Sequence, residues 1–263
     1  MGLRIQNNVE AFNAHRQLSS TAMKAAKAME KLSSGYRVNR AADDAAGLAI
    51  SEKMRAQIGG LVQSQRNAQD GVSLVQTAEG ALNEVHSMLG RIRELKVQYD
   101  TGTLSTDDQA AIATEVTALK AEITAIGTDT KFNGKALLTG TAFDFVVGAD
   151  GEKVSTTGVT LSTDIGTIDI TASAGGLATI DAAIKNVSTS RAQLGAVQNR
   201  LEHRLNNLAS YQENLVASES RIRDVDMAAE MVNFTKLQIL QRAGTSMLAQ
   251  ANQAPQGVLS LLR

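Results

Sequence analysis

The sequence contains no cysteine, no tryptophan and a single proline, and aromatic residues make up only 3% of it. The absence of cysteine excludes a disulfide framework, thiol catalysis and a sulfur-ligated metal. So few aromatic side chains favour long helices packed at close range over a thick globular core. The net charge of −1 provides no global positive field, so we expect neither nucleic acid nor an anionic membrane as a partner.

Targeting segments are missing as well. No stretch of about 18 apolar residues could span a bilayer. The N-terminus, Met1 to Gln6, has no apolar signal region and no small-residue cleavage site. We therefore expect a protein that is cytoplasmic, or that is exported by a route that reads no cleavable signal.

The chain is organised around a heptad pattern that runs from Leu177 to Ile222. Aliphatic side chains recur every seven residues and place one apolar stripe along an uninterrupted helix. A helix of this length cannot bury its stripe alone, so it requires partner helices of similar length. We predict that the stripe forms an intramolecular seam made of Ile180, Val187, Leu194, Leu201, Leu208 and Leu215.

Three earlier segments have helical spacing and are candidate partners. Gly35 is expected to cap the end of the first, and Ser105 or Thr106 is expected to cap the start of the third. Three glycines in the second, Gly59, Gly60 and Gly71, weaken the expectation of a continuous helix. The predicted segments are residues 3–34, residues 45–99, and a third helix that ends near residue 127.

Between residues 132 and 171 the apolar spacing changes from helical to alternating. Alternation over Phe143–Val147, followed by a Gly148–Gly151 turn, predicts one short β-hairpin. Alternation over Val159–Leu161 and Ile168–Ile170 predicts a second hairpin. We expect both hairpins to lie in the connection between the helices.

A last helix follows Ile222, and Pro255 is expected to break it at Ala254. The tail beyond the proline is apolar and should be exposed and disordered in an isolated subunit. Burying each aliphatic side chain would contribute on the order of 1.5–3 kcal/mol, which indicates an assembly. These side chains are Val258, Leu259, Leu261 and Leu262.

Both ends of the chain resemble bacterial flagellin, over roughly residues 1–140 and 177–263. The region between them, where that family varies, is short here. The stretches that carry the resemblance are Leu32–Asn39 (LSSGYRVN), Ala42–Ile50 (ADDAAGLAI), Arg66–Gly71 (RNAQDG), Gln76–Glu84 (QTAEGALNE) and Ser220–Ala228 (SRIRDVDMA).

The resemblance implies a mainly α fold, a long antiparallel coiled coil or helix bundle built from both chain ends, with small β-hairpins in the middle. Residues 1–42 and 223–263 would form an inner-tube coiled-coil domain. Residues 43–222 would form an outer-layer helical rod domain with hairpins at about 131–175. The expected polymerisation seam of the inner tube is Phe12, Leu18, Leu32, Leu237, Leu240, Leu259 and Leu262.

The implied function is that of a structural subunit that polymerises into the flagellar filament, with no catalytic site, no cofactor and no metal. The terminal helices would fold on assembly. The implied partners are other copies of the chain, an export chaperone at the C-terminal helix, the flagellar type III export apparatus, and the filament cap and hook-junction proteins. The expected location is the extracellular filament, reached without a cleaved signal peptide.

Many flagellins are also bound by Toll-like receptor 5. The positions that match the receptor patch are Arg91, Leu95 and Glu115. Gly90 stands where recognised flagellins usually have a glutamine, and this loses one side-chain contact.

Other interpretations remain open. The hook–filament junction protein shares the terminal helices, and a cytoplasmic coiled-coil binding module would share the heptads. Asp43 and Asp44 could form an acid–base or metal-binding pair, but neighbouring helical residues point about 100° apart. We therefore interpret them as a helix cap that pairs with Arg37 or Arg40.

Overall fold

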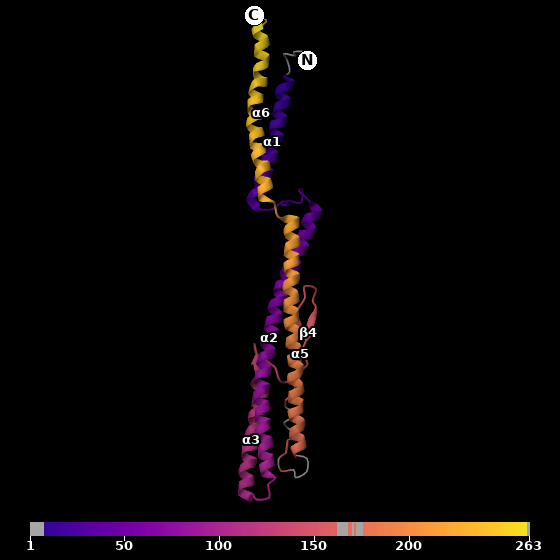
Figure 1. Cartoon of the computed structure of the whole chain (residues 1–263), viewed down its shortest axis with the longest axis vertical. Coiled ribbons are helices and arrows are strands. Elements are labelled where there is room, and N and C mark those ends of the chain that lie inside the picture. Colours follow the sequence, from indigo (N-terminus) through magenta and orange to yellow (C-terminus); the bar gives the residue numbers. More distant parts are fainter. Residues whose placement is uncertain (1–7, 162–167, 170, 172–175, 262–263) are drawn as a thin grey trace. The chain divides into compact units, whose positions relative to one another are not determined.

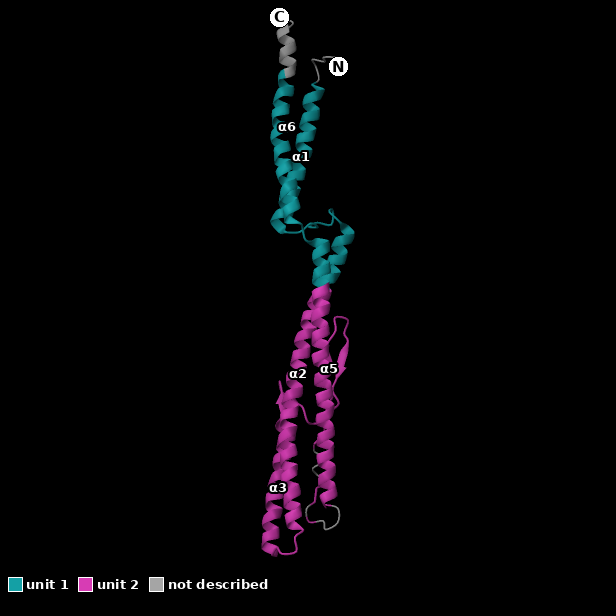
Figure 2. Cartoon of the chain, viewed as in Figure 1, with its two compact units in different colours: residues 1–56, 215–263 teal, residues 57–214 magenta. Residues whose placement is uncertain are grey.

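The structure is a computed structural model that describes residues 8–161, 168–169, 171 and 176–261, with side chains as far as residue 253. Contacts divide the chain into two units (Figure 2). Residues 1–56 and 215–263 form what we call the terminal unit, and residues 57–214 form the central unit. The fold is mainly α with two small antiparallel strand pairs, as predicted.

In the terminal unit, helix α1 (Val9–Ser34) lies antiparallel to helix α6 (Met227–Leu261) (Figure 1). Gly35 ends α1 with a left-handed φ of 75°, and its N–H donates to the carbonyl of Lys31, as the sequence predicts. The core between the two helices is small. Among the described side chains it consists of Ala25, Ala28 and Leu237, with Phe234 packed against them.

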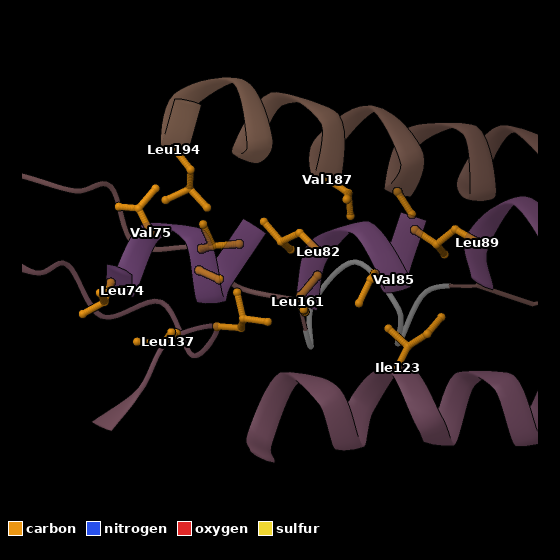
Figure 3. Close-up of a cluster of buried hydrophobic side chains, with 14 of the residues drawn as sticks. Leu74, Val75, Leu82, Val85, Leu89, Ile123, Leu137, Leu161, Val187 and Leu194 are labelled. Atoms are coloured by element: carbon orange, nitrogen blue, oxygen red, sulfur yellow. The ribbon is translucent and has the colours of Figure 1, made fainter. Parts of the chain in front are cut away.

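The central unit is built on α2 (Ala45–Tyr99) and α5 (Gly176–Arg223), both of which extend into the terminal unit. The third helix, α3 (Thr106–Asp129), packs against α2. Their apolar stripes meet in one continuous core. Side chains from the connecting segments, such as Leu137 and Leu161, also belong to this core (Figure 3). Ser105 caps α3 in a reciprocal capping box with Asp108, one of the two predicted arrangements.

Helix α2 is continuous through its three glycines. Two of them lie where the hairpin of strands β3 (Asp144–Val146) and β4 (Lys153–Ser155) packs on the helix. A methyl group at Gly71 would lie 3.1 Å from the ring of Phe145 and from Cδ1 of Leu201, and one at Gly60 would lie 3.3 Å from Cβ of Ala149. Gly59 has open space instead. Gly60 and Gly71 therefore admit a close neighbour, and none of the three glycines interrupts the helix.

We expect Gly71→Val to lower the free energy of unfolding by about 1–3 kcal/mol, because the new side chain would overpack the contact with Phe145. Gly59→Val is the matched control, since the same substitution there meets no atom within 4 Å. The control should leave stability unchanged or raise it by a few tenths of a kcal/mol through helix propensity. Urea unfolding of both variants measures the difference, and equal stability would contradict the packing account.

Within the described residues two hairpins occur, and one of them was predicted. Strands β3 (Asp144–Val146) and β4 (Lys153–Ser155) pair antiparallel across the Gly148–Gly151 turn. The second hairpin pairs β1 (Lys131–Phe132) with β2 (Lys135–Ala136). Its two-residue turn is Asn133–Gly134, both with positive φ. This hairpin was not predicted, although Asn-Gly is a strong local signal for such a turn.

The predicted hairpin of Val159–Leu161 with Ile168–Ile170 is wrong as far as the described residues show. Thr160 forms only an isolated bridge with Thr139. Val159, Leu161 and Ile168 are buried in the core of the central unit. Their alternation therefore reflects insertion into that core, not strand pairing. Ile170 and residues 162–167 lie outside the described part.

The predicted break at Pro255 is also wrong, because α6 continues to Leu261. A proline lacks the N–H that would bond to the carbonyl four residues earlier, which here is that of Ala251. The side chain of Asn8 supplies the missing donor, since its Nδ2 lies 2.7 Å from the Ala251 carbonyl. Its Oδ1 meanwhile accepts from the N–H of Ala11 and caps α1. One asparagine thus serves both helices.

Candidate assembly surfaces

The predicted intramolecular seam lies along α5. Five of its six side chains are buried with exposed fractions of 4% or less, and Leu215 is half-buried. Ile180, Val187, Leu194 and Leu201 belong to the continuous core that also contains the buried apolar side chains of α2. The five buried residues are Ile180, Val187, Leu194, Leu201 and Leu208.

The residues predicted for the polymerisation seam fall into two groups. Leu237 is buried, and Leu18 and Leu32 are half-buried. Leu18 contacts the backbone of α6, where a methyl group at Gly244 would lie 3.2 Å from its Cδ1. These three side chains are therefore partly or fully covered within the chain itself.

The second group remains uncovered. Phe12 is 71% exposed and Leu240 is 47% exposed. The side chain of Leu259 and the whole of Leu262 lie outside the described part. An exposed phenylalanine and leucine on facing helices are expected where another molecule covers the surface.

Leu240 belongs to an apolar surface along one side of α6. Its neighbours Val232 and Ile239 are 72% and 61% exposed. Contiguous exposed apolar patches of this kind mark interaction sites on soluble proteins. The residues that form this surface are Met231, Val232, Thr235, Lys236, Ile239 and Leu240.

The carboxylates of Asp43 and Asp44 have separate structural roles. Asp44 caps α2, since its Oδ1 accepts from the N–H of Gly47 at 2.8 Å. Asp43 forms an ion pair with Lys27 at 2.5 Å and accepts from the backbone N–H groups of Arg40 and Asn39. The Lys27 hydrogen bond and then the Arg40 N–H lower the pKa of Asp43 from 3.8 to about 2.

The predicted pairing of these aspartates with Arg37 or Arg40 side chains is therefore wrong. The Arg40 guanidinium bonds to Glu30 at 2.8 Å, and the Arg37 guanidinium donates to the carbonyl of Ile222. The cap interpretation holds for Asp44, and the ion-pair partner of Asp43 comes from α1. Periodicity alone does not reveal that partner, because Lys27 is 16 residues away in the sequence.

Three residues that no sequence pattern singled out as functional are Tyr36, Glu52 and Arg223. These residues meet where the connection after α1 crosses the connection before α6, and the guanidinium of Arg223 lies over the Tyr36 ring. Tyr36 and Arg223 belong to two of the stretches that carry the resemblance described above, which the structure brings side by side.

The predicted receptor patch is split between surface and core. Arg91 and Glu115 are exposed and joined by hydrogen bonds of 3.1 and 3.0 Å, and the carboxylate of Glu115 raises the pKa of Arg91. Leu95 is only 2% exposed and belongs to the core. Two of the three predicted positions, Arg91 and Glu115, are therefore accessible on the surface.

No arrangement for metal binding occurs among the described residues, in which no three His, Asp or Glu side chains lie close enough to share an ion. Within the same part of the chain, none of the helices combines the length and the apolar character needed to cross a membrane.

Comparison with known families gives two matches. The description "bacterial flagellin N-terminal helical region" fits residues 5–142, and "bacterial flagellin C-terminal helical region" fits residues 177–262. Together they cover α1, α2 and α3 on one side and α5 and α6 on the other.

Individual relatives match over nearly their full length. A flagellin of Halalkalibacterium halodurans is 54% identical and covers 98% of this chain and 99% of its own. A flagellin of Bacillus subtilis is 47% identical over 99% and 100% of the two chains. A flagellar filament core protein of Treponema phagedenis is 46% identical over 98% and 99%.

Among solved structures, the crystal structure of Bacillus cereus flagellin superposes with a TM-score of 0.51 and 31% identity. The match covers 59% of this chain and 94% of the Bacillus cereus chain. Three observations therefore point to the same family. They are the exposed apolar faces of α1 and α6, the pairing of two stretches that carry the resemblance, and these full-length matches. The chain belongs to the bacterial flagellin family, whose members are structural proteins of the flagellar filament and not enzymes.

Proposed function

We propose that copies of this chain polymerise through α1 and α6, which fold together on assembly. Residues 1–42 and 223–263 form the inner tube, and residues 43–222 form the outer layer. The observation that carries the proposal is the contrast between the two cores. The central unit has a large continuous core, whereas α1 and α6 share three buried apolar residues among the side chains that the structure describes.

The small core explains why assembly and folding are coupled. Ordering a residue costs about 1–2 kcal/mol of backbone entropy, and α1 and α6 contain 26 and 35 residues. Burial of Ala25, Ala28 and Leu237 offsets little of that cost. Burial of exposed side chains such as Phe12 and Val232 against neighbouring copies supplies the remainder.

The apolar face of α6 also accounts for the expected partners before export. A chaperone that covers Val232, Ile239 and Leu240 keeps the chain soluble until the flagellar type III apparatus exports it without a cleaved signal. Outside the cell, the filament cap and hook-junction proteins contact the same terminal helices. For Toll-like receptor 5, the exposed Arg91–Glu115 pair is the contact surface, and Leu95 acts from the core by holding α2 in place.

The test of polymerisation is electron microscopy of the purified protein after depolymerisation and slow reassembly. Long hollow tubes of uniform diameter are expected. Only short oligomers, even with added seeds, would favour the hook–filament junction protein or a coiled-coil binding module. Full-length matches to flagellins do not favour either alternative.

Deletion of residues 254–263 is expected to prevent tube formation without unfolding the central unit, because it removes apolar side chains of α6 that neighbouring copies would bury and leaves residues 57–214 intact. Sedimentation measures polymer, and circular dichroism measures the fold of the soluble subunit. A wild-type yield of filaments from the truncated chain would refute the role of this tail.

Asp43 should make the assembled state sensitive to acid. Its pKa is lowered on folding, so its contribution is fully present above about pH 4 and is lost as the pH falls towards about 2. Wild-type filaments should therefore dissociate more steeply over this window than filaments of the Asp43→Asn variant, which has no carboxylate to protonate. Sedimentable protein as a function of pH measures both. Parallel curves would show that Asp43 does not contribute.

A further inference from the structure

Within the terminal unit, the connection after α1 crosses the connection between α5 and α6. Tyr36 and Asp224 form an antiparallel bridge. Two backbone hydrogen bonds flank it, from the N–H of Arg37 to the carbonyl of Arg223 at 2.6 Å and from the N–H of Val225 to the carbonyl of Gly35 at 3.0 Å. All of these residues belong to the terminal unit.

The side chain of Arg223 fastens this crossing. Its guanidinium carbon lies 4.6 Å from the centre of the Tyr36 ring, and its Nη1 lies 2.6 Å from Oε1 of Glu52. The Arg223 side chain is 11% exposed, so its guanidinium is largely shielded from water, while the Glu52 side chain is 56% exposed and keeps its other contacts with solvent. A partly desolvated cation–π contact combined with a charge-assisted hydrogen bond is among the stronger polar arrangements in proteins.

The crossing lies at a short and defined distance from both helices. Tyr36 follows the last residue of α1 by two positions, and Arg223 precedes the first residue of α6 by four. A slip of one residue at the bridge would turn one helix by about 100° relative to the other. Ala28 and Leu237 would then no longer face each other.

From this geometry we propose that Tyr36, Glu52 and Arg223 form a clasp that sets the register of α1 against α6 and provides the starting point for their folding. This inference rests on the proposed function, in which the two helices fold during assembly. Starting an isolated helix is costly, and closing a loop between two distant segments adds to that cost. The clasp reduces both costs by holding the two chain segments together before the helices grow.

The assembly kinetics of three variants test the roles of the side chains. Arg223→Gln removes the charge and should raise the critical concentration about tenfold and lengthen the lag, because both contacts of the guanidinium are lost. Tyr36→Leu removes the aromatic face and should act in the same direction. Tyr36→Phe keeps the face and should assemble like the wild type. Wild-type assembly by Arg223→Gln would overturn the proposal.

General destabilisation is distinguished by thermal unfolding of the soluble subunit, which reports the core of the central unit. All three variants should melt at the wild-type temperature, because the clasp residues lie outside residues 57–214. A drop in melting temperature that parallels the assembly defect would overturn the positioning role.

The absence of cysteine permits a sharper experiment with the double variant Tyr36→Cys, Asp224→Cys. The flanking hydrogen bonds make 36 and 224 a non-hydrogen-bonded antiparallel pair, whose Cα atoms are typically about 4.5 Å apart. That separation is within the range of about 4.4–6.8 Å that a disulfide requires. The variant lacks the tyrosine ring, so its reduced form should assemble poorly.

Oxidation should restore assembly, because the disulfide holds the same crossing in the same register. If the oxidised protein assembles as poorly as the reduced protein, the crossing does not set the register and the clasp proposal fails. Failure of the wild type itself to form tubes would instead contradict the proposed polymerisation.

Discussion

The Leu201→Asp variant is expected to be largely unfolded. Leu201 is fully buried on α5, where it contacts α2 beside Gly71 in the core of the central unit. Removing a buried leucine side chain costs about 2–5 kcal/mol, and an unpaired carboxylate in its place adds several more. Small domains are stable by only about 5–15 kcal/mol, so the variant loses most or all of that stability.

Circular dichroism and urea unfolding of the soluble subunit measure this effect. Tyr211→Asp is the control, since it places the same charge on the same helix at a side chain that is 45% exposed. The control should melt close to the wild type. An unchanged melting curve for Leu201→Asp would show that the apolar stripe of α5 does not face the core.

The long helices were predictable because their bounds depend on local signals. The expected bounds of 45–99 for α2 and 177–222 for α5 agree with the structure to within one residue at each end. Gly35 and Ser105 were recognised as caps from residue type and spacing alone. Periodicity and capping are properties of neighbouring residues, so a single sequence displays them.

The errors arose where the deciding contact is distant in sequence. Pro255 would end an isolated helix, but Asn8, 243 residues from Ala251, replaces the missing donor. Alternation at Val159 and Leu161 suggested a strand, whereas both side chains fill the core. The hairpin at Asn133–Gly134 is different, because its signal was local and was overlooked.

The same distinction applies to the assembly surfaces. The heptad stripe identified which face of α5 is apolar, and the structure added that α2 covers it. For the terminal helices, the sequence could not separate side chains covered within the chain, such as Leu237, from those left open, such as Phe12. The clasp was hidden for a similar reason, because Tyr36 and Arg223 meet only after the chain has folded back.

The Leu240→Asp variant is expected to fold normally as a subunit and to fail in polymerisation. Leu240 lies outside the core that α1 and α6 share, and its side chain is 47% exposed. In the assembly we propose, a neighbouring copy covers it, so the aspartate would be buried without a partner. A penalty of several kcal/mol per contact corresponds to a rise in critical concentration of about 100-fold or more.

Gln241→Asp is the matched control, because it adds the same charge one residue further along α6, about 100° around the helix. Gln241 lines a polar surface with Gln238, Arg242 and Thr245, so the control should assemble close to the wild type. Seeded elongation and sedimentation measure both variants. If both assembled equally well, α6 would not use the face that contains Leu240. The same leucine-to-aspartate substitution at Leu201 and at Leu240 therefore separates the two roles of an apolar stripe. Leu201 stabilises the fold of the subunit, whereas Leu240 contacts the neighbouring copy in the proposed assembly.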